Sequence, residues 1–241
     1  MNLVLDIGNN YFKLGIFDNS NLIHNISNEN NEIENEILKV ISNYKLVSHV
    51  LISNVSSNNL NYLFEKKDFK IYDLKYTFNL PFTISYKTPQ TLGNDRIALA
   101  AAATVLYPNS NNIIIDAGTC ITIDFLNDKN IFFGGSISPG IQMRYQSLNS
   151  QTAKLPLLNK SSEIHFPGNS TENSIHSGVI GGICHEIMGF VKQINSDYKE
   201  VNVILTGGDA KFLSKTLKIT IFANQIFILE GLNSILNLNK Q

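Results

Sequence analysis

One residue pattern occurs twice in this chain and constrains its fold more than any other feature. An apolar run ends in Asp, a spacer, Gly and polar residues, first at residues 3–10 (LVLDIGNN) and again at residues 113–119 (IIIDAGT). Asp6 and Asp116 lie 110 positions apart in a chain of 241 residues, and each copy is followed by a second apolar alternation. Each copy therefore predicts a β-hairpin with a buried first strand and a polar turn, and the spacing predicts two similar halves.

The two predicted turns carry the polar chemistry of these hairpins. A lone Asp-x-Gly is most simply explained by an Asp that accepts hydrogen bonds from its own turn amides. The repetition favours a different interpretation. Two such turns facing each other across a cleft would offer two carboxylates for a hydrated metal ion and two sets of amides for phosphate oxygens, and so could hold a nucleotide without a P-loop.

The composition is that of an enzyme of modest size. The chain is 43% hydrophobic, which is enough to bury a full core, and its net charge of −1 gives no basic surplus for a nucleic-acid partner. No apolar run is as long as a membrane span, and the N-terminus enters a strand without the regions of a signal peptide. We therefore expect a cytoplasmic protein with no nucleic-acid or membrane partner, in which Cys120 and Cys184 are reduced packing residues.

The first half reads as three strands followed by alternating helices and strands. The strands are expected at residues 3–6, 11–17 and 22–26, and an amphipathic helix carries apolar residues from Ile33 to Ile41. Further strands are expected at residues 50–52 and 70–72, with a short helix at residues 60–64 between them. This alternation predicts an α/β fold.

A polar loop from Leu80 ends at Asn94-Asp95-Arg96, directly before an alanine-rich helix expected at residues 97–106. An acid at this place complements the helix dipole, and Arg96 could pair with a neighbouring carboxylate. The alternative is functional. Asp95 would then be a base, and Arg96 would anchor an anionic substrate.

The second half repeats the hairpin and adds a strand at residues 131–137 and a helix after Gly140. A long helix is expected after Thr171, and its small residues (Ser174, Ser177, Gly178, Gly181, Gly182) suit either a subunit interface or a close contact within the chain. A strand at residues 201–205 ends in a glycine turn, Thr206 to Asp209, at a helix start where a nucleotide could bind. The last helix is expected at residues 226–236.

Several other kinds of site are excluded or disfavoured. The chain has no P-loop, no Gly-x-Gly-x-x-Gly after a strand and no Gly-x-Ser-x-Gly elbow. None of its five histidines has a partner at a metal-ligand spacing, so we interpret all five as surface or satisfied core residues.

Taken together, these motifs resemble type III pantothenate kinases, members of the superfamily of acetate and sugar kinases, heat-shock protein 70 and actin. The resemblance covers nearly the whole chain. Its most specific parts are the loop from Tyr86 through Pro89 and Leu92-Gly93 to Asp95-Arg96, and the segment Thr152-Ala153-x-Leu155-Pro156. The other matching motifs are Asp6-Ile7-Gly8-Asn9, Asp116-Ala117-Gly118-Thr119, Gly134-Gly135-x-Ile137-x-Pro139-Gly140, Thr171 with Ser177-Gly178, and Thr206-Gly207-Gly208.

The resemblance implies two tandem ribonuclease-H-like (actin-like ATPase) domains, residues 1–110 and 111–241, each with a mixed sheet flanked by helices, with nucleotide and substrate in the cleft between them. It implies ATP-dependent phosphorylation of pantothenate, the first step of coenzyme A biosynthesis, by a homodimeric kinase that uses magnesium with ATP. Asp95 would be the catalytic proton acceptor, and Asp116 would bind a monovalent cation, potassium or ammonium. The implied ATP-binding residues are Asp6, Ile7, Gly8, Asn9, Asn10, Tyr11, Phe12, Lys13 and Thr119, and those for pantothenate are Tyr86, Gly93, Asn94, Asp95, Arg96 and Thr171.

The chain departs from the family pattern at three places without losing a proposed catalytic group. Asn10 stands where Ser or Thr is usual, Cys120 replaces Ala, and Ser170 replaces Asn before Thr171. Lys13 lies on a strand, where it could be a solvated residue as easily as a phosphate ligand. Two other functions remain open: another small-molecule kinase of the superfamily, or an actin-type accessory protein that binds a nucleotide without catalysis.

Overall fold

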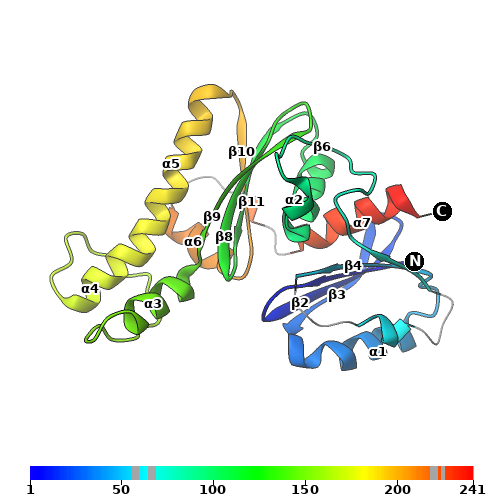
Figure 1. Ribbon diagram of the computed structural model, residues 1–241, viewed down its shortest axis with the longest axis horizontal. Coiled ribbons are helices and arrows are strands. Elements are labelled where there is room, and N and C mark those ends of the chain that lie inside the picture. The colour runs from blue at the N-terminus through cyan, green and yellow to red at the C-terminus, as the bar shows by residue number, and fades with distance from the viewer. Residues whose placement is uncertain (56–59, 65–68, 218–221, 224–225, 241) are drawn as a thin grey trace. The chain divides into compact units, whose positions relative to one another are not determined.

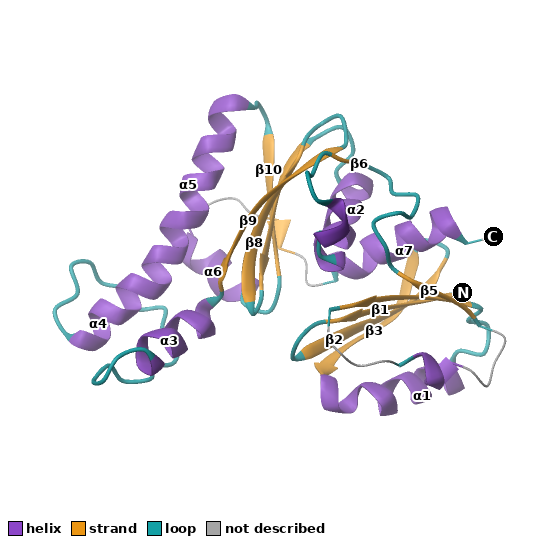
Figure 2. Ribbon diagram, viewed as in Figure 1, coloured by secondary structure: helices purple, strands orange, loops and turns teal. Residues whose placement is uncertain are grey.

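The computed structural model describes residues 1–55, 60–64, 69–217, 222–223 and 226–240 (Figures 1 and 2). Its contacts divide the chain into two units. Unit 1 comprises residues 1–109, 130–132 and 226–241, and unit 2 comprises residues 110–129 and 133–225. Within the described ranges, no helix combines the length and the hydropathy that a membrane crossing requires.

Unit 1 is built on a five-stranded mixed sheet of order β3-β2-β1-β4-β5. Strands β1 (Asn2–Ile7), β2 (Tyr11–Asp18) and β3 (Asn21–Glu29) form an antiparallel meander. Strands β4 (His49–Asn54) and β5 (Lys70–Asp73) extend the sheet in parallel beyond β1. All five strands expected in the first half are thereby confirmed.

Successive side chains of β1 point to opposite faces of the sheet, and each face is covered by a different helix. Leu3, Leu5 and Ile7 join the core that α1 (Ile33–Asn43) covers, as the apolar periodicity of that helix predicts. The opposite face is covered by α7 (Phe227–Asn239), which contacts β1, β4 and α2 (Asn94–Leu106) (Figure 1). Asp6 shares this second face, because it lies an odd number of positions from Leu5 and Ile7.

The short helix expected at residues 60–64 is a 3-10 turn, η2 (Asn61–Phe64).

The C-terminal helix α7 packs closely on α2 within unit 1. A Cβ atom added to Gly231 would overlap the carbonyl group of Ala98, so glycine is what lets the two backbones approach. At the N-terminal end of β1, the Asn2 amide nitrogen donates to Asn233 Oδ1 (2.7 Å) and Asn237 Oδ1 (2.9 Å). Contacts therefore group residues 226–241 with unit 1, whereas the sequence-based division places them in the second half.

Replacing Gly231 with Ala is expected to lower the free energy of unfolding by about 1–3 kcal/mol, because α7 must move off α2 to admit the methyl group. Urea titration followed by circular dichroism measures this change. Leu238→Ala is the control, since Leu238 lies on the same helix and is 50% exposed. Equal stability of the Gly231 and Leu238 variants would contradict the close packing inferred here.

Unit 2 repeats the sheet of unit 1. Its strands β7 (Asn111–Ala117), β8 (Cys120–Leu126), β9 (Ile131–Pro139, which enters unit 2 at Phe133), β10 (Val201–Thr206) and β11 (Phe222–Ala223) have the order β9-β8-β7-β10-β11. As in unit 1, the first strand is antiparallel to the second and parallel to the fourth, and the fourth is parallel to the fifth. The predicted duplication and its fold class, two α/β halves with mixed sheets flanked by helices, are confirmed. The additional strand β6 (Thr83–Ile84) pairs with Ile131 and Phe132, which belong to unit 1.

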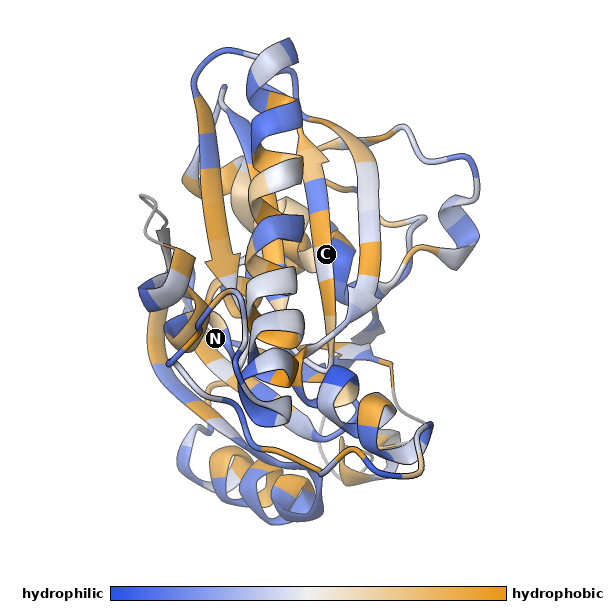
Figure 3. Cartoon of the chain, turned by 90° about the vertical axis from the view of Figure 1, so that its left-hand side faces the viewer, coloured by the Kyte–Doolittle hydropathy of each residue, from blue (hydrophilic) through white to orange (hydrophobic). Residues whose placement is uncertain are grey.

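The helices of unit 2 are α3 (Ile141–Ser150), α4 (Thr171–His176), α5 (Gly182–Asp197) and α6 (Ala210–Leu217). The predicted long helix is continuous but contains a π-helical turn, η4 (Ser177–Gly181), between α4 and α5. Figure 3 shows apolar and polar residues alternating along it, and Ile183, Ile187 and Val191 pack into the core of the unit. A Cβ atom at Gly178 would meet no described atom within 4 Å, so no close contact with the described residues of unit 2 explains that glycine.

Candidate functional site

The first turn follows β1 and is bordered by side chains from two neighbouring strands. Asp6 pairs in register with Lys13 of β2 on one side and Ser53 of β4 on the other, so all three side chains share one face. Ser53 Oγ donates to Asp6 Oδ1 over 3.1 Å. Lys13 therefore lies beside the Asp6 carboxylate rather than on the opposite face of the sheet. Sequence reasoning missed Ser53, whose signal was a hydroxyl residue directly after the buried β4 run.

Asn30 holds the backbone of this first turn. Its side-chain amide donates to the carbonyl oxygens of Gly8 (2.9 Å) and Asn9 (3.1 Å), and its backbone N–H donates to the carbonyl of Asn10 (3.0 Å). Three carbonyl oxygens are thus engaged from one residue, which reduces the repulsion that an anion near the turn would meet. No periodic or motif signal in the sequence singled out Asn30.

The other expected ATP residues of this segment differ in what they can contribute. Ile7 and Phe12 are buried in the core, so only their backbone groups are available to a ligand. Tyr11 is exposed, and Gly8 closes the turn by donating its N–H to the Tyr11 carbonyl (3.0 Å). For Ile7 and Phe12 a phosphate-binding role would therefore rest on backbone amides, whereas the side chains of Asn9, Asn10 and Tyr11 are exposed.

Asp95 lies in the first turn of α2, as the sequence predicted. Its Oδ1 accepts a hydrogen bond from the Arg96 backbone N–H (2.8 Å), which fixes the carboxylate at the helix start. A Cβ atom on Gly93 would overlap that carboxylate oxygen, so Gly93 is required for this carboxylate position. Asn94 uses its side-chain amide to donate to the carbonyl of Leu74 (3.1 Å), which anchors the helix start to the segment after β5.

Arg96 is buried between aromatic side chains of unit 1. Its Cζ lies 5.5 Å from the centroid of the Tyr86 ring and 5.9 Å from that of Phe132, and the residue is 5% exposed. Aromatic faces stabilise a guanidinium and leave its N–H donors at the edge of the group. The structure therefore brings Tyr86, Asp95 and Arg96 together, and it adds Phe132, which sequence reasoning missed.

Asp116 in unit 2 has surroundings that repeat those of Asp6. It pairs in register with Thr122 of β8 and Thr206 of β10, so a carboxylate again lies between two polar side chains. The Thr122 hydroxyl is buried and makes no hydrogen bond to any residue that the structure describes. Gly207 adopts φ +95° and leaves room for Asp116, because a Cβ there would meet Asp116 Oδ1 at 2.5 Å. Carboxylate and hydroxyl oxygens of this kind suit a hard cation.

Thr119 lies in the second turn, which is one residue shorter than the first. Gly118 donates its N–H to the carbonyl of Cys120 (3.0 Å), and Gly140 donates its N–H to the carbonyl of Thr119 (3.0 Å).

The prediction that both cysteines are packing residues is wrong for Cys120, which is exposed at the start of β8. Cys184 is half-buried in the core, and burial raises the pKa of its thiol.

Thr171 is exposed at the start of α4, a position set by Ser170. Ser170 Oγ accepts a hydrogen bond from the Asn173 backbone N–H (3.1 Å), so the Ser that replaces the usual Asn still caps the helix.

Further along α4, buried His176 shares a hydrogen bond of 2.7 Å with the Tyr145 hydroxyl, and burial raises the pKa of Tyr145 to about 12. His176 is therefore a satisfied core histidine, as predicted.

Comparison with known proteins shows the family to which the chain belongs. The family model described as type III pantothenate kinase matches residues 2–193. A protein named type III pantothenate kinase from Flavobacterium johnsoniae is 41% identical, over 97% of this chain and 96% of that protein.

Two solved structures share the fold at lower sequence identity. One from Campylobacter jejuni, assigned to the Baf family of transcriptional activators, has a TM-score of 0.64 at 22% identity and covers 98% of this chain and 97% of its own. The activator of 2-hydroxyisocaproyl-CoA dehydratase from Clostridium difficile has a TM-score of 0.56 at 14% identity, covering 98% of this chain and 93% of its own. These two similarities concern the fold alone. The family match, in contrast, extends over most of the sequence. The chain therefore belongs to the type III pantothenate kinase family.

Proposed function

We propose that the protein transfers the γ-phosphoryl group of ATP to the primary hydroxyl of pantothenate, giving 4′-phosphopantothenate in the first step of coenzyme A biosynthesis. Membership of the family supports the substrate assignment. The observation that carries it in this chain is the start of α2, where one helical turn presents a fixed carboxylate, Asp95, beside a guanidinium held by aromatic rings, Arg96.

The roles of Asp95 and Arg96 follow from the chemistry of the substrate. Arg96 would bind the pantothenate carboxylate through its edge N–H donors, with Tyr86 and Gly93 to Asn94 alongside. Asp95 would accept the proton of the distal hydroxyl as the new phosphorus–oxygen bond forms and the bond to the ADP oxygen breaks. Phosphoryl transfer needs alignment and charge neutralisation more than covalent help from the protein.

We assign ATP binding to hydrogen-bond donors of each turn, considered separately in its own unit. Amides of Asp6 to Lys13, the Lys13 ammonium and the Thr119 hydroxyl and amide are the donors that we assign to this role. Magnesium, when bound with ATP, neutralises phosphate charge, and it usually keeps several waters and only one or two carboxylate ligands.

Asp116 would hold the monovalent cation. The buried Thr122 hydroxyl supports this proposal, since it has no hydrogen-bond partner among the described residues and supplies an oxygen atom directly opposite Asp116 in the sheet register. Thr206 offers a second hydroxyl on the other side. Potassium and ammonium are the ions that we assign here.

We also propose that the protein is a homodimer in the cytoplasm, with Thr171 contributing to pantothenate binding. Gly178, where an added Cβ atom would meet none of the described atoms within 4 Å, supports a subunit contact through the small residues of the long helix. The exposure of Thr171 at a capped helix start leaves its hydroxyl accessible to a ligand.

The test of the activity is ADP release from ATP and magnesium, with pantothenate or with a panel of sugars and short carboxylates, in potassium and in sodium buffer. Pantothenate-dependent, potassium-stimulated release supports the whole proposal. Release that depends on a sugar or another acid would assign a different kinase, and ATP binding without substrate-dependent release would favour an accessory protein.

Replacing Asn30 with Ala is expected to raise the KM for ATP about 10-fold, because two side-chain hydrogen bonds to the first turn are lost. The KM for pantothenate is expected to stay within about 2-fold of wild type. Asn30→Asp removes the same donors with almost no change of size and should weaken ATP binding at least as much. Steady-state kinetics with each substrate varied in turn give both constants.

The control for this variant is Asn28→Ala, which removes an exposed Asn two positions earlier whose Oδ1 accepts only from the neighbouring Glu29 N–H in the described contacts. If Asn28→Ala and Asn30→Ala change the KM for ATP equally, the hydrogen bonds from Asn30 to the first turn do not contribute specifically to ATP binding.

A further inference from the structure

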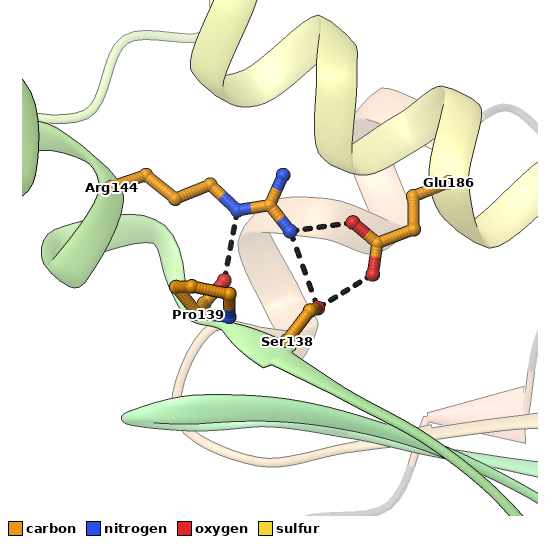
Figure 4. Close-up of polar contacts among 4 residues, drawn as sticks. All are labelled: Ser138, Pro139, Arg144 and Glu186. Atoms are coloured by element: carbon orange, nitrogen blue, oxygen red, sulfur yellow. Dashed lines mark hydrogen bonds and ion pairs between the residues drawn. The ribbon is translucent and has the colours of Figure 1, made fainter.

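A polar network in unit 2 connects the end of β9, the start of α3 and the second turn of α5 (Figure 4). Arg144 donates from Nε to the carbonyl of Pro139 (2.9 Å) and from Nη2 to Glu186 Oε2 (2.5 Å) and Ser138 Oγ (3.2 Å). Ser138 Oγ in turn donates to Glu186 Oε1 (2.5 Å). Each carboxylate oxygen of Glu186 accepts one of these hydrogen bonds, and the Arg144 guanidinium donates to three different groups.

The dipole of α3 does not favour a cation at the position of Arg144. Arg144 lies in the first turn of α3, which contains no acidic residue, and a cation at a helix N-terminus is opposed by the helix dipole. Glu186 compensates this charge from another helix. The side chains of Arg144 and Glu186 are 21% and 24% exposed, so solvent screens the pair less than it would screen a pair on the open surface.

Glu186 gives the network a rigid base. It lies on α5 directly before Ile187, and Ile183, Ile187 and Val191 of the same helix are buried in the core of unit 2. The network therefore fixes the β9–α3 junction against an element that is itself held by apolar packing.

The β9–α3 junction is in direct backbone contact with the second turn. Gly140, which follows Pro139, donates its N–H to the Thr119 carbonyl (3.0 Å). A Cβ atom on Gly140 would overlap the carbonyl oxygens of both Gly118 and Thr119. A shift of the junction is thus transmitted to the turn without an intervening side chain.

We propose that Arg144 and Glu186 are positioning residues that set the conformation of the Gly118–Thr119 turn and, through it, the affinity for ATP. This inference rests on the proposed function, which assigns the phosphate groups of ATP to Thr119. Neither residue needs to touch the nucleotide. Their effect passes from the guanidinium to the Pro139 carbonyl, and from Gly140 to the Thr119 carbonyl.

The test compares Arg144→Met, Arg144→Lys and Glu186→Gln with wild type by two readouts. The first is steady-state kinetics, in which Arg144→Met and Glu186→Gln are expected to raise the KM for ATP about 10-fold with little change in the KM for pantothenate. Arg144→Lys keeps the charge opposite Glu186 and should recover part of the loss. The second is amide hydrogen exchange without ligand, in which peptides containing Gly118 and Gly140 should exchange faster in Arg144→Met.

Two control variants separate positioning from general stability and from charge. Ile187→Val weakens the packing of the same helix without touching the network, and Lys192→Met removes one exposed cation from α5. Both are expected to leave the KM for ATP within about 2-fold of wild type. The proposal is overturned if Ile187→Val raises this KM as much as Arg144→Met, or if Arg144→Met and Glu186→Gln leave both readouts unchanged.

The outcome also distinguishes this inference from the proposed function. A wild-type protein without pantothenate-dependent ADP release would refute the function. Hydrogen exchange and direct titration of ATP binding would still decide whether the network controls the turn, and faster exchange without weaker ATP binding would refute the link to the nucleotide.

Discussion

Replacing Asp95 with Asn is expected to lower kcat for pantothenate phosphorylation by roughly 10²–10⁴-fold, the usual contribution of a general base. The amide cannot take the proton of the substrate hydroxyl. It can still accept the Arg96 backbone N–H through its remaining oxygen, so the start of α2 should be preserved. Steady-state ADP release at saturating ATP and pantothenate measures the effect, and ATP affinity should not change.

The alternative role of Asp95, complementing the dipole of α2, predicts a different result. A dipole contribution is worth about 0.3–1 kcal/mol of stability and does not change kcat. Thermal unfolding of Asp95→Asn, beside Asp18→Asn as an exposed acid of the same unit, separates the two roles. A variant that keeps more than about a tenth of the wild-type kcat would contradict the assignment of Asp95 as the base.

Replacing Arg96 with Met is expected to lower kcat/KM for pantothenate by roughly 10²-fold, because charge-assisted hydrogen bonds to the substrate carboxylate are lost. Methionine retains an apolar chain between Tyr86 and Phe132, whose rings lie 5.5 and 5.9 Å from the guanidinium carbon in the wild type. The comparison substrate is the analogue with a primary alcohol in place of the carboxylate. Wild type should strongly prefer pantothenate, and the Met variant should lose that preference.

Arg96→Lys is the matched variant, since it keeps the positive charge and loses the planar fork and the stacking on the rings. It should retain a preference for the carboxylate with weaker binding. Circular dichroism must first show that both variants are folded, because Arg96 is buried. If the Met variant is folded and still prefers pantothenate as strongly as wild type, another group binds the carboxylate.

The local elements could be predicted because their signals lie within a few residues of one another. The alternation in β1, β2, β7 and β8 and the helical periodicity of α1 determine which faces are apolar, and the structure has these elements where the sequence placed them. The two-residue strands β6 (Thr83–Ile84) and β11 (Phe222–Ala223) were missed, because segments of this length have no period to detect. The 3-10 turn η2 and the π turn η4 were missed as such, since the apolar spacing of such short segments resembles that of an α-helix.

The site was predicted where its chemistry is concentrated in motifs and missed where it depends on register. Asp95 and Arg96 are adjacent in sequence, and helix α2 fixes their relation. Ser53 comes beside Asp6 only because β4 pairs with β1 in one particular register, and a one-residue shift would turn it to the other face. Asn30 contacts the first turn, and Phe132 contacts Arg96. No local sequence pattern connects either residue to the group that it contacts.

By itself the sequence determined the duplicated hairpins, the α/β class, the polar turns with their two Asp residues and the acid at the start of α2, since each depends on neighbours within one strand or one helical turn. Tertiary structure alone decided that the C-terminal helix packs in unit 1 on α2. It also decided that Arg144 and Glu186 meet beside the second turn, although 42 positions separate them. The physical reason is that burial and backbone register select such distant partners only after the elements have formed and packed.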